Sequence, residues 1–291
     1  MQPTVASLWR YPVKSCRGES LARVEVEPWG LTQDRRWMVV DPAGGMVTAR
    51  ELNGLLVVHP TLTDDGLRLT VPGAAAVDVP LPDPTAQVPI SIWSSRLTAA
   101  DAGDGAAAWL SEVLGREVRL VHLDDPRRRP TSPTYSEPDD RVSLADGYPL
   151  LLTSRASAEA VSAAAEAPVP MHRYRPNLVV EGTEPWAEDT WRRFRIGDVT
   201  FRVVKGCARC VMTTMEPDHD AGTVARGPEP TRTLARLRRF GKGVWFGVNV
   251  IPDHPLPTGA TIAVGDPVEV LEAVEPGTPP IGSVARERQP P

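Results

Sequence analysis

The stretch V-T-F-R-V-V-K-G-C-A-R-C, from Val199 to Cys210, joins the pattern of a strand to a pair of cysteines. Val199, Phe201 and Val203 alternate with polar residues, and this period of two is typical of a half-buried strand. Cys207 and Cys210 are therefore predicted to lie just past the end of a strand. The stretch predicts a β-rich fold that presents a C-x-x-C pair where a strand ends.

Two common uses of a C-x-x-C pair fit this sequence poorly. A redox dithiol should open a helix, whose N-terminal dipole lowers the pKa of the thiol, but the following residues 211–215, V-M-T-T-M, prefer a strand. A structural zinc site needs two further ligands, and neither Cys16 nor any of the five histidines lies at zinc-finger spacing. The pair is therefore not expected to be a redox dithiol or half of a zinc site.

A third kind of site uses one thiolate as the ligand of a metal or of a sulfur. It needs nearby cations that stabilise the thiolate and any anionic ligand. Arg209 lies between the two cysteines, and Arg173 and Arg175 lie a short way upstream. The pattern favours this kind of site, although two buried structural cysteines remain an open alternative.

Further basic and hydroxyl residues lie next to predicted turns and strand ends. Lys14 and Ser15 follow the first predicted strand, Arg35 precedes another, and Arg50 comes at the end of a hairpin. A phosphate-bearing ligand would bind to such groups through charge-assisted hydrogen bonds. For any single one of them, a solvated surface charge is the competing interpretation.

The rest of the chain is also predicted to be mainly β, with a few helices. A helix is predicted from Asp104 to Gly115, a second in the alanine-rich run 157–166 and a short basic one over 231–239. The run 124–141 is rich in proline and charge and is predicted to be a long surface loop. Further strands are predicted over 5–11, 21–26, 36–41, 46–48, 66–71, 88–93, 118–123, 148–153, 244–251 and 261–271.

The amino-acid composition excludes few functions and is typical of an ordinary soluble protein. The 291 residues are 41% hydrophobic and 24% charged with a net charge of -5, which gives no reason to expect nucleic acid or a membrane surface as a partner. No run of about 18 apolar residues is present, and the N-terminus lacks the pattern of a secretory signal. A cytoplasmic location is therefore expected.

Several motifs together resemble one family, the MOSC-domain proteins with an N-terminal MOSC β-barrel, which include the mitochondrial amidoxime-reducing component and bacterial hydroxylaminopurine-resistance reductases. The resemblance runs almost from end to end. Its landmarks are Y-P-V-K-S-C at 11–16, G-L-x-x-D-R-x-W at 30–37, M-V-T-A-R at 46–50, D-G-Y-P-L at 146–150, Y-R-P-N at 174–177, C-A-R-C-x-x-T-T at 207–214 and G-D-P-V at 265–268.

The resemblance implies a mainly β (α+β) fold of two packed units. An N-terminal MOSC β-barrel domain would span 1–120, and a C-terminal MOSC β-barrel domain with a few helices would span 121–274. Residues 275–291 are expected to form a flexible tail. A pyranopterin molybdenum cofactor would lie between the two domains.

The resemblance also implies the roles of individual residues. Cys210 would be the molybdenum ligand and the catalytic residue, while Cys207 and Cys16 would be structural. The pterin and its phosphate would be held by Lys14, Ser15, Arg35, Arg50, Thr153, Ser154, Arg175, Asn177 and Arg209. A soft thiolate suits molybdenum bound by dithiolene sulfurs, and a phosphate suits fixed cations.

The activity implied is the two-electron reduction of N-hydroxylated or related oxidised small molecules. No cysteine follows Cys210 to form a plant-type iron–sulfur site, so a separate electron-donor protein of the ferredoxin or flavin reductase type is expected. Two alternatives stay open: a sulfurtransferase that carries a persulfide on Cys210, and a protein that stores or delivers the molybdenum cofactor. The cations at Lys14, Arg35 and Arg175 argue against a pure persulfide carrier, which has no use for a phosphate pocket.

Overall fold

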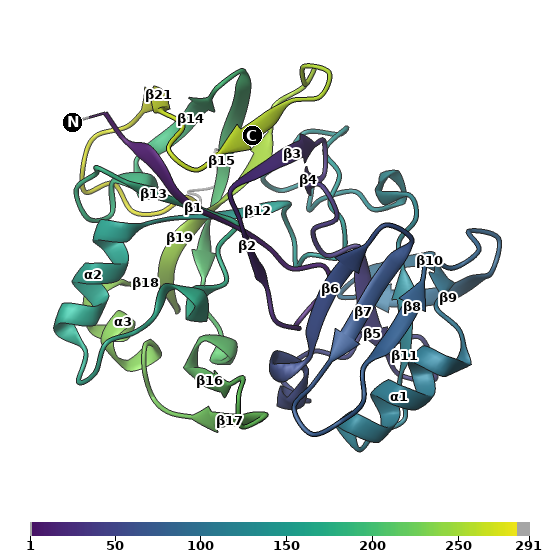
Figure 1. Cartoon of the computed structure of the whole chain (residues 1–291). Helices are drawn as coiled ribbons and strands as arrows, with labels where there is room; N and C mark the ends of the chain where they lie inside the picture. Colours follow the sequence, from purple (N-terminus) through teal and green to yellow (C-terminus); the bar gives the residue numbers. More distant parts are fainter. Residues whose placement is uncertain (1, 284–291) are drawn as a thin grey trace, which may run out of the picture.

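The largest sheet of the protein has nine strands and contains most of the second half of the chain. The structure is a computed structural model that describes residues 2–283, and Figure 1 shows this sheet on the left of the molecule. Its path runs through β2 (Glu19–Leu21), β1 (Thr4–Arg10), β13 (Leu178–Glu181), β12 (Leu150–Ser154), β19 (Gly243–Pro252), β15 (Val199–Ala208), β14 (Trp191–Ile196) and β21 (Val268–Ala273), with β18 (Arg239–Phe240) paired to β19.

The strand predicted from Val199 is confirmed as β15. Val199, Phe201 and Val203 are buried, and they belong to the main hydrophobic core, which is formed on this sheet. Strand β15 ends at Ala208, so Cys207 is its next-to-last residue and Cys210 lies just beyond its end. The alternation of apolar and polar residues thus decides which side chains enter the core and leaves the cysteine pair at the edge of it.

A second group of strands contains much of the first half of the chain and lies on the right of Figure 1. One sheet has the order β5 (Trp37–Val40), β11 (Arg119–His122), β10 (Ser95–Asp101) and β9 (Gln87–Ile92), and another joins β6 (His59–Thr63), β7 (Gly66–Thr70) and β8 (Val77–Pro80). Two separate cores lie in this group. The mainly β fold is therefore confirmed.

The strand pairing does not follow the predicted boundary between 120 and 121. Strand β1 pairs antiparallel with β13, and β3 (Arg23–Glu27) pairs with both β4 (Gly30–Leu31) and β20 (Thr261–Ala263). The first strands of the chain are thus built into the body formed by its second half. The two sequence domains remain a prediction, and the segment 4–31 physically joins them.

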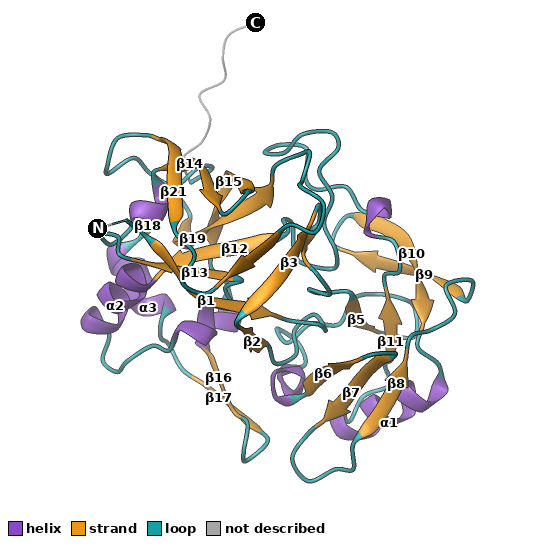
Figure 2. Cartoon of the chain, turned by 45° about the horizontal axis from the view of Figure 1, so that its top comes forward, coloured by secondary structure: helices purple, strands orange, loops and turns teal. Residues whose placement is uncertain are grey.

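Three α-helices flank the strands, as Figure 2 shows, with α2 and α3 on one side and α1 at the opposite end of the molecule. Helix α1 (Asp104–Leu114) ends as predicted at Gly115, whose φ of 65° closes the last turn in the left-handed region. Asp104 is in the first turn and Gly103 precedes it, so the cap is one residue earlier than expected. Helices α2 (Arg155–Ala164) and α3 (Thr231–Leu237) confirm the other two predictions approximately.

Two segments that were predicted to be loose are packed. In the run 124–141, Arg129 and Asp140 are buried, because Arg129 donates to the carbonyls of Ser143 and Ala145 and Arg202 forms an ion pair with Asp140 at 2.6 Å. The prediction of a surface loop is confirmed, since the run contains no strand and many of its residues are exposed. Its proline and charge do not keep it from packing, because Arg129 and Asp140 anchor it to the rest of the fold.

The predicted tail 275–291 is packed in the part that the structure describes. The N–H of Gly206 donates to the carbonyl of Ile281 at 3.0 Å, and Ile281 packs against the main core. Residues 275–283 therefore do not form a free tail, and residues 284–291 lie outside the described residues. Within residues 2–283, no helix has both the length and the apolar character that a membrane span requires.

Candidate cofactor and active site

Three of the predicted site residues have a left-handed backbone conformation. The φ angles are 70° for Ser15, 47° for Arg35 and 55° for Arg175. Non-glycine residues rarely adopt this region, and such strain is concentrated at functional sites, where surrounding hydrogen bonds hold it. Here the N–H of Arg35 donates to the carbonyl of Tyr11, and the N–H of Arg175 donates to that of His172.

A cavity of about 180 Å³ lies where these three turns meet the end of β15. It collects most of the side chains predicted from the sequence, although they come from distant parts of the chain. The predicted residues that line it are Lys14, Ser15, Arg35, Arg50, Arg175, Asn177, Arg209 and Cys210, together with Cys207. We call this space the cysteine cavity.

Thr153 and Ser154, which were also predicted to bind the cofactor, do not line the cysteine cavity. Thr153 is fully buried, and its hydroxyl contacts the sulfur of Met171 at 3.3 Å. The hydroxyl of Ser154 caps helix α2 by accepting the N–H of Ser157 at 3.0 Å. The structure thus uses Ser154 to start a helix and not to hold a ligand in this cavity.

Asp146 is the main residue of the site that sequence reasoning missed. One of its carboxylate oxygens accepts from Lys14 Nζ at 2.5 Å, and the other accepts from Arg50 Nη2 at 2.7 Å. Arg129 holds the backbone of this loop in place by donating to the carbonyl of Asp146 at 2.8 Å. The D-G-Y-P-L landmark includes this position, but nothing in the residues around it indicates that its carboxylate joins two cations.

The electrostatics of this clamp follow from the burial of Lys14 and from the charges of the three side chains. Burial lowers the pKa of Lys14 to about 8, and Asp146 opposes that shift. Burial acts against ionised Asp146, but Lys14 and Arg50 outweigh it and hold the pKa of this carboxyl well below its usual range. Although burial lowers the pKa of Arg50, Asp146 and the nearby Cys210 raise it above its ordinary value. Arg50 is therefore a fixed cation beside the Cys210 sulfur.

A second group of cations lies around Tyr11, and its members Arg35 and Arg175 line the cavity. Arg35 Nη1 donates to Asn177 Oδ1 at 2.7 Å and forms an ion pair with Asp34 at 2.5 Å. The guanidinium carbons of Arg35 and Arg175 lie 4.3 and 4.2 Å from the centroid of the Tyr11 ring. Among the described residues, the Arg175 side chain has no hydrogen bond and no carboxylate partner, so its charge is available to a ligand.

The three cysteines lie in different surroundings. Cys16 is fully buried, and burial raises the pKa of its thiol to about 12, which suits a structural role. Cys207 accepts a hydrogen bond from Arg209, whereas Cys210 is half-buried at the start of the 3₁₀ turn η5 (Val211–Thr214).

The segment after Cys210 is not a strand, contrary to expectation. The hydroxyls of Thr213 and Thr214 donate back to the carbonyls of Cys210 and Val211, at 3.0 and 2.7 Å, and hold the single turn η5. This turn is too short to act as the helix that a redox dithiol needs. Within the part of the chain that the structure describes, no three His, Cys, Asp or Glu side chains are placed to hold a metal together.

The residues present fit an anionic cofactor that is bound through one thiolate. Among the described residues, a single carboxylate lines the cavity, that of Asp146, and it faces six basic side chains. These are Lys14, Arg35, Arg50, Arg173, Arg175 and Arg209. The Nε of Arg209 is buried without a hydrogen-bond partner, so the site holds a donor that a ligand could satisfy. A phosphate and a metal that prefers sulfur match this set of groups.

Comparison with known protein families gives matches in both halves of the chain. Residues 2–117 match the MOSC N-terminal beta barrel domain, and residues 139–269 match the MOSC domain. Curated relatives align over nearly the whole chain. Mitochondrial amidoxime-reducing component 1 of Homo sapiens is 35% identical over 92% of this chain and 83% of its own length.

Two other relatives show the same extent of similarity. Mitochondrial amidoxime-reducing component 1 of Mus musculus is 36% identical over 92% of this chain and 82% of its own, and mitochondrial amidoxime reducing component 2 of Rattus norvegicus is 33% identical over 91% and 82%. These mitochondrial relatives overturn the expectation of a cytoplasmic location, which was based on the lack of a long apolar run and of a secretory pattern. The chain belongs to the family of MOSC-domain proteins with an N-terminal MOSC β-barrel.

Proposed function

We propose that this protein is a molybdenum-cofactor-dependent oxidoreductase that reduces N-hydroxylated or related N-oxygenated small molecules by two electrons. The observation that supports it most directly is the position of Cys210, a half-buried thiol in a cavity surrounded by cations. The relatives are named for amidoxime reduction, which is one reaction of this class.

Cys210 is proposed to ligate the metal through its thiolate. Arg50 is close enough to Cys210 to affect it electrostatically and is itself held by Asp146. A thiolate is the form in which cysteine binds metals. When bound, the cofactor supplies the two-electron chemistry that breaks the N–O bond of the substrate.

The other cations are proposed to hold the pterin and its phosphate. Among the described residues, the Arg175 guanidinium stacks on Tyr11 and has no hydrogen-bond partner, and Arg35 is oriented by Asn177. Both can therefore donate to phosphate oxygens at little cost in side-chain ordering. Lys14 and Ser15 are buried beside them, where a fixed charge interacts more strongly than in water. Arg209 completes the group with its unpartnered Nε.

The overall reaction requires electrons and protons that come from outside the chain. An amidoxime takes up two electrons and two protons and yields an amidine and water. We propose that the electrons come from a separate donor protein of the ferredoxin or flavin reductase type, which docks near the cysteine cavity. The names of the relatives favour a mitochondrial setting for this pair of proteins.

The test is the content and activity of protein made in a host that synthesises the cofactor. Molybdenum is measured by mass spectrometry and the pterin by fluorescence after oxidation, and amidoxime consumption is followed with a chemical electron donor. About one molybdenum and one pterin per chain with amidoxime reduction is the expected result. Bound cofactor without turnover of any N-oxygenated compound would instead indicate a carrier, and folded protein without molybdenum would favour a persulfide on Cys210.

A further inference from the structure

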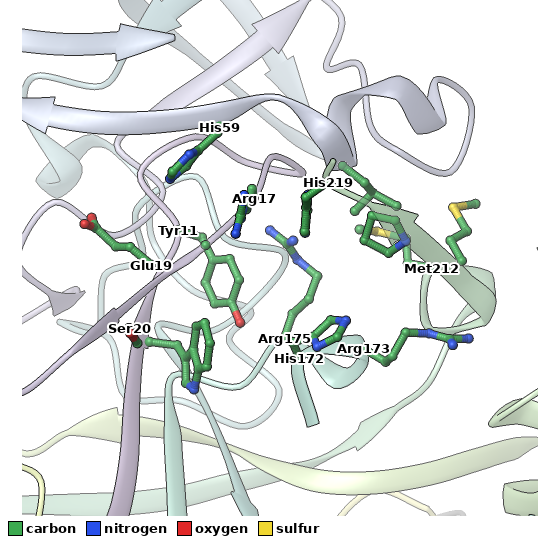
Figure 3. Close-up of a pocket in the computed structure, with 15 residues that line it drawn as sticks. Tyr11, Arg17, Glu19, Ser20, His59, His172, Arg173, Arg175, Met212 and His219 are labelled. Atoms are coloured by element: carbon green, nitrogen blue, oxygen red, sulfur yellow. The ribbon is translucent and has the colours of Figure 1, made fainter. Parts of the chain in front are cut away.

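A second, larger cavity of about 420 Å³ adjoins the cysteine cavity. Three histidines from separate elements line it: His59 begins β6, His172 lies in the 3₁₀ turn η3 (Met171–Tyr174), and His219 lies between β16 (Met215–Asp218) and β17 (Thr223–Arg226). We call it the histidine chamber, and Figure 3 shows its side chains. Arg173, Arg175 and Met212 line both cavities, so the two spaces share one wall.

The chamber is formed where the two halves of the chain meet. The β16–β17 hairpin packs against the 3₁₀ turn η1 (Asn53–Val57), which belongs to the first half. This contact brings His219 to the same space as His59. Arg17 is held between them by its backbone, because its N–H donates to the carbonyl of Val58 at 3.0 Å.

The side chains of Arg17 and Arg175 line the chamber without a carboxylate partner among the described residues. Figure 3 shows the side-chain ends of Arg17 and Arg175 directed toward each other, with His219 beside them. Within residues 2–283, neither guanidinium forms an ion pair or a hydrogen bond with another side chain. The Nδ1 atom of His219 is also buried without a partner. Two guanidinium groups and a histidine therefore meet in a space where, among the described residues, Glu19 supplies the one lining carboxylate.

The carboxylates near the chamber form ion pairs or hydrogen bonds with other groups, or lie at the rim of the chamber. Glu19 forms an ion pair with Arg10 at 2.9 Å, and Glu216 pairs with Arg173. Asp218 acts on His219 from the exposed hairpin, but its Oδ1 accepts the backbone N–H groups of residues 220 and 221.

Burial and the nearby arginines act in the same direction on the pKa values of the three histidines. Burial lowers the pKa of His59 and His219, and the charge of Arg17 lowers both further. For His172, burial also lowers the pKa; Glu216 opposes this shift, while Arg173, Arg175 and Arg17 add to it. An anion in the chamber would relieve this repulsion.

The remaining walls are apolar or aromatic. Trp9 and Tyr11 supply rings, and Leu56, Met212 and Met215 supply flexible apolar surface. A chamber of this volume has room for a single ring system with a short substituent. The chemistry of the walls thus suits a flat apolar body that ends in an anionic group.

We propose that the histidine chamber binds the carboxylate of an aromatic substrate whose N-oxygenated group reaches the cysteine cavity through the shared wall. The identity of the reacting N-oxygenated group rests on the proposed function, whereas the binding of the carboxylate in the chamber does not. It predicts that acidic aromatic N-hydroxylated compounds are preferred over neutral ones of the same shape. The terminal phosphate of the cofactor is the competing source of an anion, and the test separates the two.

The test compares a charged probe with its neutral counterpart on the cofactor-loaded protein. The binding of 2-naphthoate and 2-naphthamide is measured by calorimetry and by the fluorescence of the tryptophans, of which Trp9 lines the chamber. The variants are Arg17→Gln and, in case that change perturbs folding, His219→Asn on the hairpin. Arg68→Gln is the matched control, because Arg68 is exposed on β7 and its one ion-pair partner among the described residues is Asp78, which is also exposed.

We expect the unmodified protein to bind 2-naphthoate at least about tenfold more tightly than 2-naphthamide. Arg17→Gln should weaken the binding of 2-naphthoate by about tenfold and leave the binding of 2-naphthamide unchanged. The molybdenum content of this variant should also be unchanged. Arg68→Gln should change neither value. Equal binding of acid and amide would overturn the proposal. So would loss of molybdenum and pterin in Arg17→Gln, which would place the cofactor phosphate in the chamber. Acid binding in a protein that reduces no amidoxime would uphold the chamber and refute only the reaction.

Discussion

The guanidinium of Arg209 donates a hydrogen bond to the sulfur of Cys207, with Nη1 and Sγ 3.0 Å apart. The Nη2 atom of the same guanidinium donates to the carbonyl of Tyr174 at 2.7 Å. Arg209 therefore links the Cys207 sulfur to the backbone at Tyr174. No such bond from Arg209 reaches Cys210, whose neighbour in the cavity is Arg50. The two cysteines of one motif thus have different partners and are expected to behave differently.

Replacing Cys210 with serine should remove molybdenum from the purified protein. A hydroxyl is a poor substitute for a soft thiolate on a metal that already prefers sulfur. The fold should be retained, because Cys210 is half-buried at the cavity and lies outside the hydrophobic cores. Molybdenum content by mass spectrometry and the thermal midpoint of unfolding together measure both effects.

The matched change is Cys207→Ser, which keeps a group able to accept from Arg209. We expect molybdenum content close to that of the unmodified protein, with at most a loss of a few-fold if Arg209 shifts. If Cys207→Ser lost the metal and Cys210→Ser kept it, the assignment of the ligand would have to be reversed.

Replacing Arg175 with alanine should weaken cofactor retention without unfolding the protein. Among the described residues, the Arg175 guanidinium only stacks on Tyr11, so few contacts within the protein are lost. A hydrogen bond to a charged group contributes roughly 1.5–3 kcal/mol, which corresponds to a factor of about 10 to 100 in the affinity for the phosphate. The rate of pterin release during dialysis and the midpoint of urea unfolding are the measurements.

Lysine at the same position serves as the control for charge. Arg175→Lys should retain cofactor better than alanine but less well than arginine, because an ammonium cannot donate two parallel bonds to a phosphate. A drop of several kcal/mol in the free energy of unfolding for alanine would instead make Arg175 a structural residue.

The sequence predicted those parts of the fold that depend on residues close together along the chain. The alternation in Val199–Ala208 identifies a strand because burial of every second side chain is a local property. The site residues followed from short motifs, and eight of the ten proposed ligand-binding residues line one cavity. Thr153 and Ser154 lie outside this cavity: the hydroxyl of Ser154 caps helix α2 and that of Thr153 contacts Met171, because a hydroxyl near a strand end can serve the fold as well as a ligand.

Contacts between distant segments could not be predicted from one sequence. The pairing of β1 with β13 joins Leu8 to Leu178, and nothing local at either strand specifies the other. Asp146 likewise acquires its role only when Lys14 and Arg50 are brought to it from elsewhere in the chain. Packing of the charged run 124–141 depends in the same way on Arg202, which lies on β15.

Replacing Arg238 with leucine should destabilise the protein by about 3–5 kcal/mol. Arg238 forms a buried ion pair with Asp189, and its guanidinium carbon lies 4.6 Å from the centroid of the Trp186 ring. Burial raises the pKa of Asp189 to about 7 even though Arg238 opposes the shift, so the carboxylate depends on this partner. Urea unfolding measures the effect.

Arg239→Gln is the control, since its exposed side chain should change the free energy of unfolding by less than about 0.5 kcal/mol. The double change Asp189→Asn with Arg238→Leu should recover part of the loss, because it removes the uncompensated carboxylate as well. Equal destabilisation by the single and the double change would show that lost packing, and not the stranded charge, causes the effect.

Protonation of His122 should destabilise the protein in mild acid. Burial, followed by the nearby charge of Arg36, lowers the pKa of His122 from 6.5 to about 4, and its ring lies 4.5 Å from that of Trp37. Below pH 6.5 the unfolded chain binds a proton that the folded protein does not accept until about pH 4. Stability contributed by neutral His122 is therefore full above pH 6.5 and is lost as the pH falls toward 4, by up to about 3 kcal/mol. Because His122→Gln does not titrate, its free energy of unfolding should fall less between pH 7.5 and 4.5 than that of the unmodified protein. Equal losses for the two proteins in urea unfolding at these pH values would mean that His122 is not buried in its neutral form.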